Sequence, residues 1–183
     1  MSWNPFRASR PDVGWISVGL ASSFPDLDDD MLSLAEPRPC SDAETRPGCR
    51  VFKVPQDDTS RNSEVVLVDE DPELMDLKEQ VVVFRYKGKF YAVDHQCPHA
   101  SFPLSRGTPF DIEDFGMVLS AGVTCPKHGW SFDLITGMAD HARYKLKTWE
   151  VQLRDVKDAL PAGDAADPKV PQEVWVRRKP KMG

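Results

Sequence analysis

The chain has 183 residues, of which 40% are hydrophobic and 28% charged, which suits one domain with a core and is short for two. Its formal net charge of −6 argues against nucleic-acid binding, because that function needs a basic surface. Mean hydropathy is −0.44 and no apolar run approaches the roughly 18 residues of a membrane helix, so no membrane span is expected. The stretch 13–21 is interrupted by Gly and Ser and fits a strand better than an export signal, so the expected location is cytoplasmic.

Short alternating or β-branched segments, separated by Gly, Pro and Asp, predict an all-β fold. The predicted strands are 15–21, 50–54, 64–69, 81–86, 89–94, 117–120, 130–133, 146–154 and 173–178. Lys87 and Gly88 lie between two of these segments and predict a tight hairpin turn. One short helix is predicted around 72–79.

Residues 25–48 are rich in proline and acidic side chains and hold few large apolar residues. They predict a surface insertion with little regular structure, extending to about residue 62. Cys40 and Cys49 fall in it and are interpreted as free surface thiols, with pairing or metal binding as alternatives. The acidic runs 26–30 and 69–73 are interpreted as solvated loops, with a docking face for a basic redox partner as the alternative.

Two short motifs carry the chemistry of the chain. Cys97 and His99 form a C-x-H pair, Cys125 and His128 form a C-x-x-H pair, and 25 residues separate the pairs. Thiolates and imidazoles are ligands of zinc and of iron–sulfur centres. The C-x-H spacing needs a loop that curls both side chains toward one point, and the proline after each cysteine suits such a loop. Zinc sites usually place two Cys before two His, whereas each motif here mixes one of each, so structural zinc is the remote alternative.

The residues around both motifs extend the pattern: Pro103, Ser105 and Gly107 follow the first, and the sequence GWSFDLITG follows the second. Together they resemble the Rieske family, whose two-iron, two-sulfide cluster is held by two Cys on one iron and two His on the other. The resemblance covers most of residues 12–178 without the Pro-rich insertion. It implies that four residues bind the cluster and its metal: Cys97, His99, Cys125 and His128.

The same resemblance implies the architecture. We expect a single Rieske domain over 12–179, with an antiparallel β-sandwich base and a small cluster-binding subdomain formed by two loops at about 93–138. The gap between the motifs is longer than in bacterial Rieske ferredoxins. The extra residues, around the D-I-E-D sequence at 111–114, resemble the small Rieske-domain proteins of eukaryotes.

The function implied by the resemblance is one-electron transfer, as a ferredoxin-like carrier between a flavin-dependent reductase and an oxygenase-type acceptor. A redox-sensing module and a small subunit of a larger complex are the alternatives. No nucleophile–base arrangement or nucleotide-binding motif is found, so we expect an oxidoreductase component without catalytic residues of its own rather than a complete enzyme.

Three further residues are interpreted from their positions. Trp130 fits an ordinary core aromatic, with packing against the cluster loop as the alternative. His95 is expected to be hydrogen-bonded or solvent-facing. His141 is not assigned to a second metal, because a mononuclear iron site needs two histidines and a carboxylate, and two of the four histidines already serve the cluster.

Overall fold

The computed structural model describes residues 14–28, 32–40, 43–54, 64–66, 76–141, 143–156 and 170–179. Strands dominate these residues, and none of them lies in an α-helix. The all-β class predicted from the sequence is therefore confirmed. Within the same ranges, no helix has the length and apolar composition needed to cross a membrane.

The strands, in chain order, are β1 (Ile16–Leu20), β2 (Asp26–Leu27), β3 (Pro37–Pro39), β4 (Thr45–Pro47), β5 (Cys49–Lys53), β6 (Glu64–Val66), β7 (Gln80–Tyr86), β8 (Lys89–Asp94), β9 (Thr108–Asp114), β10 (Met117–Thr124), β11 (Ser131–Asp133), β12 (Trp149–Asp155) and β13 (Gln172–Arg178). Two short 3₁₀ helices are η1 (Ala21–Ser23) and η2 (Leu104–Arg106).

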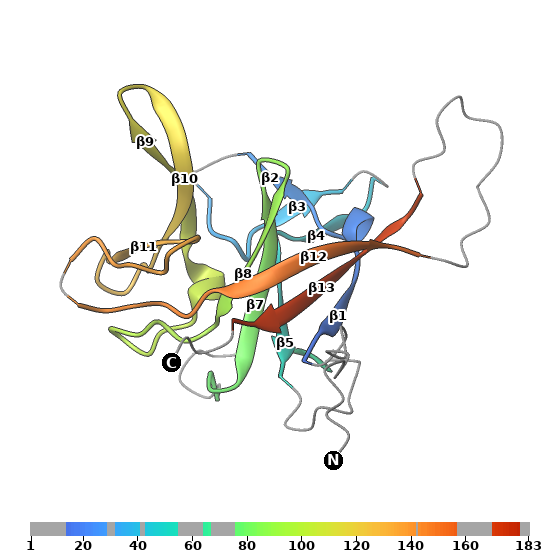
Figure 1. Ribbon diagram of the computed structural model, residues 1–183, viewed down its shortest axis with the longest axis horizontal. Coiled ribbons are helices and arrows are strands. Elements are labelled where there is room, and N and C mark those ends of the chain that lie inside the picture. The colour runs from blue at the N-terminus through green and yellow to red at the C-terminus, as the bar shows by residue number, and fades with distance from the viewer. Residues whose placement is uncertain are drawn as a thin grey trace, which may run out of the picture.

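Four sheets organise these strands. In the first, β7 pairs antiparallel with β5 and β8 and parallel with the short β2, and β6 extends the sheet beyond β5. The second has the order β1-β13-β12, the third has the order β11-β10-β9, and β3 and β4 form a small pair. Figure 1 shows the second sheet crossing the first, while the β9–β10 hairpin projects from the body.

Strand β7 is the wall shared by two hydrophobic cores. Successive side chains of a strand point to opposite faces, so an uninterrupted apolar run such as Val81–Phe84 can be buried on both. Val81 and Val83 pack in the core beneath the β1-β13-β12 sheet. Val82 and Phe84 pack in the other core, which also contains the two motif cysteines. The loops that carry the candidate ligands are thus anchored, through their cysteines, in a core that the central strand lines.

Most predicted strands are confirmed, but the prediction missed the strands β2, β3, β4 and β9, and the one predicted helix is wrong. Strand β9 lies where the sequence analysis placed only extra residues, and β10 extends to Thr124 rather than ending at 120. The helix predicted around 72–79 is not formed by its described residues, 76–79. There the Asp76 carboxylate accepts a hydrogen bond from the Lys78 backbone N–H, a local turn that competes with helix formation. Residues 72–75 lie outside the described residues.

The Pro-rich segment is less irregular and less superficial than predicted. It contributes β2, β3, β4 and the start of β5, and Leu27 and Leu34 are fully buried. Two apolar side chains are enough to anchor it, because both enter the core on the Phe84 side of β7. The interpretation of Cys40 and Cys49 as surface thiols is wrong: both are free of disulfides, but both are buried. Residues 55–62 of the predicted insertion lie outside the described residues.

Candidate metal centre

The two motif loops close with the same hydrogen-bond pattern. In the first, the Cys97 N–H donates to the Phe102 carbonyl at 2.9 Å, and the Ser101 N–H donates back to the Cys97 carbonyl at 2.9 Å. In the second, the Cys125 N–H donates to the Trp130 carbonyl at 2.8 Å, and the Gly129 N–H donates back to the Cys125 carbonyl at 3.0 Å. Each loop thus reverses direction between its cysteine and the residue five positions later. The backbone N–H groups inside each loop point toward the space between the two loops.

Both loops need a left-handed residue at the same step, four positions after the cysteine. Gly129 has φ +73°, and Ser101 has φ +51°. Glycine adopts this conformation freely, whereas a residue with a side chain does so at a cost. Gly129 is therefore a sequence signal for the second loop, and nothing in the sequence marks Ser101.

The two cysteine thiols meet in the buried interior of the site. Cys97 is 0% and Cys125 1% exposed. A hydrogen bond from the Cys125 thiol lowers the pKa of Cys97 below its ordinary value despite burial, and backbone N–H groups of Ala100 and His99 act in the same direction. The same contact with Cys97, followed by burial, raises the pKa of Cys125. The pair therefore favours one thiolate, and both sulfurs face backbone donors.

The two motif histidines also lie together. The rings of His99 and His128 are 5.1 Å apart between centroids, at an interplanar angle of 75°. His128 is exposed, whereas His99 is half-buried and its Nδ1 atom is buried without a hydrogen-bond partner among the described residues. Buried ring nitrogens are normally paired. A bond to a metal would satisfy this one, so the donor set fits a metal centre.

Aromatic side chains cover the His99 ring. Trp130 stacks on it with 4.2 Å between centroids and 20° between planes. Tyr144, which the sequence analysis missed, meets both rings edge-on at 5.2 Å. Trp130 is half-buried at the margin of the core, so its packing against the cluster loop, the alternative interpretation, is the one that the structure shows.

A buried histidine anchors the first loop. His95 is 0% exposed, its Nδ1 lies 2.8 Å from Gln80 Oε1, and its Nε2 lies 2.8 Å from Ser105 Oγ. Burial lowers the pKa of His95 to about 4, so the ring is neutral. The amide oxygen can only accept, so Nδ1 carries the proton and Nε2 accepts from the Ser105 hydroxyl. The hydrogen-bonded role expected for His95 is confirmed.

Asp133 holds the segment that follows the second loop. Its carboxylate accepts the backbone N–H groups of Ile135 and Thr136, each at 2.7 Å, and the Ser120 hydroxyl at 2.8 Å. Burial alone would raise the pKa of Asp133, but these donors lower it below its ordinary value. The carboxylate thereby ties the turn beyond β11 to β10.

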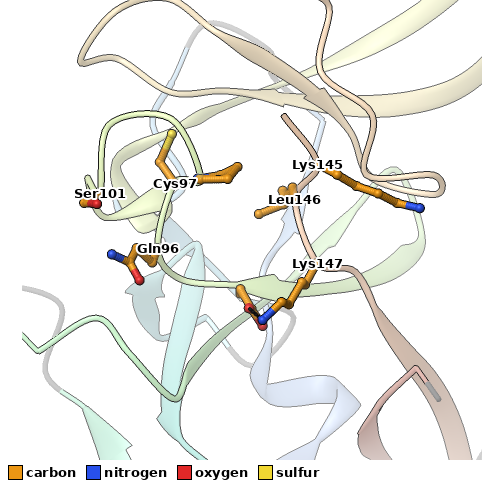
Figure 2. Close-up of a pocket in the computed structure, with 8 residues that line it drawn as sticks. Gln96, Cys97, Ser101, Lys145, Leu146 and Lys147 are labelled. Atoms are coloured by element: carbon orange, nitrogen blue, oxygen red, sulfur yellow. Dashed lines mark ion pairs between the residues drawn. The ribbon is translucent and has the colours of Figure 1, made fainter. Parts of the chain in front are cut away.

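A cavity of about 240 Å³ lies beside the first loop. One wall is Gln96, Cys97 and Ser101, and the other is the segment 145–147. Figure 2 shows Leu146 on the second wall facing Cys97, with the Lys145 side chain pointing away from the cavity. Lys147 forms an ion pair with Asp94 at 3.9 Å, which closes one end.

The structure describes all four histidines, and His141 meets the Trp130 ring edge-on, with 5.6 Å between centroids, rather than joining the two motif histidines. It is exposed and lies 3.7 Å from Asp140. In the described part of the chain, no three His, Cys, Asp or Glu side chains are grouped around one point as a single ion would need. A two-iron cluster of the Rieske type takes two protein ligands per iron and does not require such a group.

Comparison with known proteins agrees with this geometry. The family model for the Rieske [2Fe-2S] domain matches residues 52–151. A 3-phenylpropionate/cinnamic acid dioxygenase ferredoxin subunit from Photorhabdus laumondii is 39% identical over 77 residues, covering 41% of this chain and 66% of that protein. A human Rieske domain-containing protein is 34% identical over 82 residues, covering 45% of each chain.

Among solved structures, the complex of reduced oxygenase and oxidized ferredoxin in carbazole 1,9a-dioxygenase contains a chain with 22% identity and a TM-score of 0.44. The match covers 93% of this chain and 98% of that one, and its TM-score is too low to carry an argument. The family model, in contrast, matches more than half of the 183 residues. The chain belongs to the Rieske [2Fe-2S] domain family, and its cofactor is a Rieske [2Fe-2S] cluster.

Proposed function

We propose that the chain transfers single electrons through a cluster bound by Cys97, His99, Cys125 and His128. The observation that carries this proposal is the paired geometry of the two loops. The same hydrogen-bond pattern closes both, the two thiols are in contact, and the two rings lie 5.1 Å apart. The two sulfur donors thus form one pair and the two imidazoles another, which supports the proposal because the two irons of a Rieske cluster take such pairs.

The chain's own residues set the properties of that centre. When bound, the cluster supplies a reversible one-electron redox group, with a potential raised by its two neutral imidazole ligands. Backbone N–H groups from both loops donate to the cysteine sulfurs and stabilise their thiolates. Trp130 fixes the orientation of the His99 ring by stacking on it. His128 is exposed, so a docked protein can approach the centre through this ring.

The partners proposed for this chain are a flavin-dependent reductase and an oxygenase-type acceptor. Support comes from two relatives that are ferredoxin subunits, one of the dioxygenase above and one of a methanesulfonate monooxygenase. We further propose a single Rieske domain over 12–179. The loops and the β11-β10-β9 sheet form its cluster-binding subdomain at about 93–138, and the other two large sheets form its base.

The cluster assignment is tested by EPR spectroscopy of the dithionite-reduced chain, with iron and sulfide counted on the same sample. We expect a Rieske-type signal and about two irons and two sulfides per chain. His128→Ala should abolish both, whereas the matched variant His141→Ala should keep them, because that ring lies outside the paired ligands. A zinc-containing, EPR-silent preparation, or a full cluster in His128→Ala, would refute the ligand set.

Carrier and sensor functions are separated by a second measurement. A carrier is reduced by a flavin reductase and reoxidised by an oxygenase within one turnover of the latter, and stopped-flow absorption follows both steps. A sensor instead changes its affinity for a partner between its oxidised and reduced forms. Equal affinity of the two forms, together with rapid turnover, is the expected result.

A further inference from the structure

We propose that the tip of the β9–β10 hairpin is a docking site for a second protein, one that presents an apolar recess bordered by lysine or arginine side chains. The tip comprises Glu113, Asp114, Phe115, Met117, Val118 and Leu119. This proposal goes beyond electron transfer and does not depend on it, because it concerns a surface separated from Cys125 by roughly 25 Å of strand at about 3.4 Å per residue.

The tip exposes apolar side chains that a free surface rarely gathers. Phe115 is 98% exposed, Met117 67%, Leu119 60% and Val118 57%. Counted over both faces of the hairpin, they present apolar surface on the order of 500 Å², and exposed apolar surface of this size often marks an interaction site. Figure 1 shows the hairpin standing clear of the rest of the chain, so a partner can reach it from several sides.

The hairpin is held rigidly at its base. The Phe110 ring lies across β10 at Gly122, where an added Cβ would come within 2.3 Å of it, so only glycine allows this packing. Asp111 forms an ion pair with Lys87 in the turn between β7 and β8. A fixed projection loses little conformational entropy on binding, which favours affinity.

The backbone at the tip is strained in a way that displays its aromatic residue. Phe115 has φ +48° and Gly116 has φ +76°. A left-handed conformation is unusual for a bulky residue and costs about 1–2 kcal/mol. A two-residue hairpin turn requires positive φ at both central residues, and Lys87 and Gly88 adopt the same conformation between β7 and β8, with φ +47° and +79°. This tip differs in that the first of the two residues is a phenylalanine. The turn sets a fully exposed phenylalanine at the extreme end of the projection.

The charge of the hairpin selects the class of partner. Residues 108–124 contain three carboxylates and no lysine or arginine. Glu113 and Asp114 are exposed and lie directly across from Val118 and Met117, so acidic and apolar groups alternate at the tip. Basic residues around an apolar recess would complement both features. A symmetric contact with a second copy would bring like charges together, and an anionic membrane would repel them.

The test places a photo-crosslinking p-benzoylphenylalanine at position 115 of the full chain, produced in cells of its natural source. The matched control carries the same group at Leu153, which is 43% exposed on β12. We expect a covalent adduct with another protein from position 115 and not from position 153. The captured protein is then purified, and its affinity for the unlabelled chain is measured by calorimetry.

That affinity should fall at least tenfold in Phe115→Ser, in Val118→Ser and in the double variant E113K/D114K, and should be unchanged in Leu153→Ser. It should also weaken as salt is added. An adduct of twice the chain's mass would assign the tip to a second copy instead. Binding of the wild type to vesicles of phosphatidylcholine and phosphatidylserine that is lost in Phe115→Ser would overturn the proposal. So would the absence of a protein adduct, or full affinity in the tip variants.

Discussion

The cysteines of this chain differ in what surrounds their sulfur atoms. Cys97 and Cys125 share a hydrogen bond and face backbone N–H groups. The Cys49 thiol is fully buried and lies 3.9 Å from the Ser105 carbonyl oxygen. Burial raises the pKa of Cys49 to about 12, although the charge of Arg38 opposes this. A thiol reacts as its thiolate, so Cys49 is chemically inert in the folded chain.

Alkylation checks this difference. With iodoacetamide at pH 8, we expect Cys49 to remain unmodified in the native chain and to react only in urea, whether or not the cluster is present. After the cluster is removed, Cys97 should react faster than Cys49 by at least tenfold, because its pKa is lowered rather than raised. Mass spectrometry of digested peptides assigns each site. Modification of Cys49 at native conditions would contradict the burial argument.

Replacing His95 tests the anchor of the first loop. His95→Leu keeps the volume of the side chain but leaves the buried Gln80 amide and Ser105 hydroxyl without their partner. Unpaired buried polar groups cost about 1–3 kcal/mol each, so we expect about 2–4 kcal/mol less stability, read from the urea midpoint. His141→Leu, with its side chain 70% exposed, should change stability by less than about 0.5 kcal/mol. Equal midpoints for both variants would show that the anchor carries no energy.

At the scale of elements, the strands that were predicted correctly have clear local sequence patterns, whereas the features that were missed depend on tertiary contacts. β7 and β8 were predicted within one residue, because a buried apolar run and a Lys-Gly turn are local signals. β9 was missed because Pro109 and its acidic residues resemble a loop, and pairing with β10 supplies what its sequence lacks. The C-x-H and C-x-x-H spacings predicted both loops. The stacking of Trp130 on His99 and the edge contact of Tyr144 depend on side-chain directions that no spacing encodes.

Two glycines with the same left-handed backbone allow the cost of backbone strain to be compared with the cost of a steric clash. Gly137 and Gly88 have φ +75° and +79°, but a Cβ at Gly137 would lie 2.0 Å from the Leu146 carbonyl oxygen, whereas one at Gly88 meets nothing within 4 Å. Gly88→Ala should therefore cost about 1 kcal/mol and keep the cluster.

Gly137→Ala should cost several kcal/mol more, because the Leu146 N–H also donates to the Gly137 carbonyl at 2.8 Å and the displaced Leu146 packs in the core beside Cys125. Visible absorption per chain should fall with it. The urea midpoints and the cluster content of both variants test whether the close contact at Gly137, rather than its positive φ, makes glycine necessary there. Equal losses of stability and of cluster content in the two alanine variants would contradict this explanation.

At the scale of the whole molecule, the two cores share β7, so the base and the cluster region are one cooperative unit rather than two. Val81 and Val83 serve one core, and Val82 and Phe84 serve the other. A change in either core is therefore transmitted through a strand that the other needs. This arrangement explains why the Pro-rich segment cannot be a dispensable insertion: its Leu27 and Leu34 complete the core that contains Cys97 and Cys125.

Charge is distributed unevenly over the molecule. The net charge is −6, yet Lys127, Arg143, Lys145 and Lys147 are all exposed around the two loops. Three acidic groups lie among them: Asp94 pairs with Lys147 and offsets its charge, Asp140 lies beside His141, and Asp133 accepts backbone N–H groups, which leaves an excess of positive charge. An anionic reagent that approaches the cluster should respond to this local positive rim and not to the net charge, because charges beyond the Debye length are screened.

Oxidation of the dithionite-reduced chain by ferricyanide distinguishes the effect of the positive charges around the loops from the effect of the negative net charge. If the rim dominates, the second-order rate constant falls between 0.01 M and 0.1 M salt, as the Debye length shortens from about 30 Å to about 10 Å. If the net charge dominates, the same constant rises. Lys145→Glu and Lys89→Glu make equal changes in net charge, but Lys89 begins β8 at the end opposite Asp94 and the first loop. We expect Lys145→Glu to lower the rate constant at low salt and Lys89→Glu to leave it nearly unchanged. If the two charge reversals changed the rate constant equally, the net charge of the molecule rather than the charges around the loops would control the reaction.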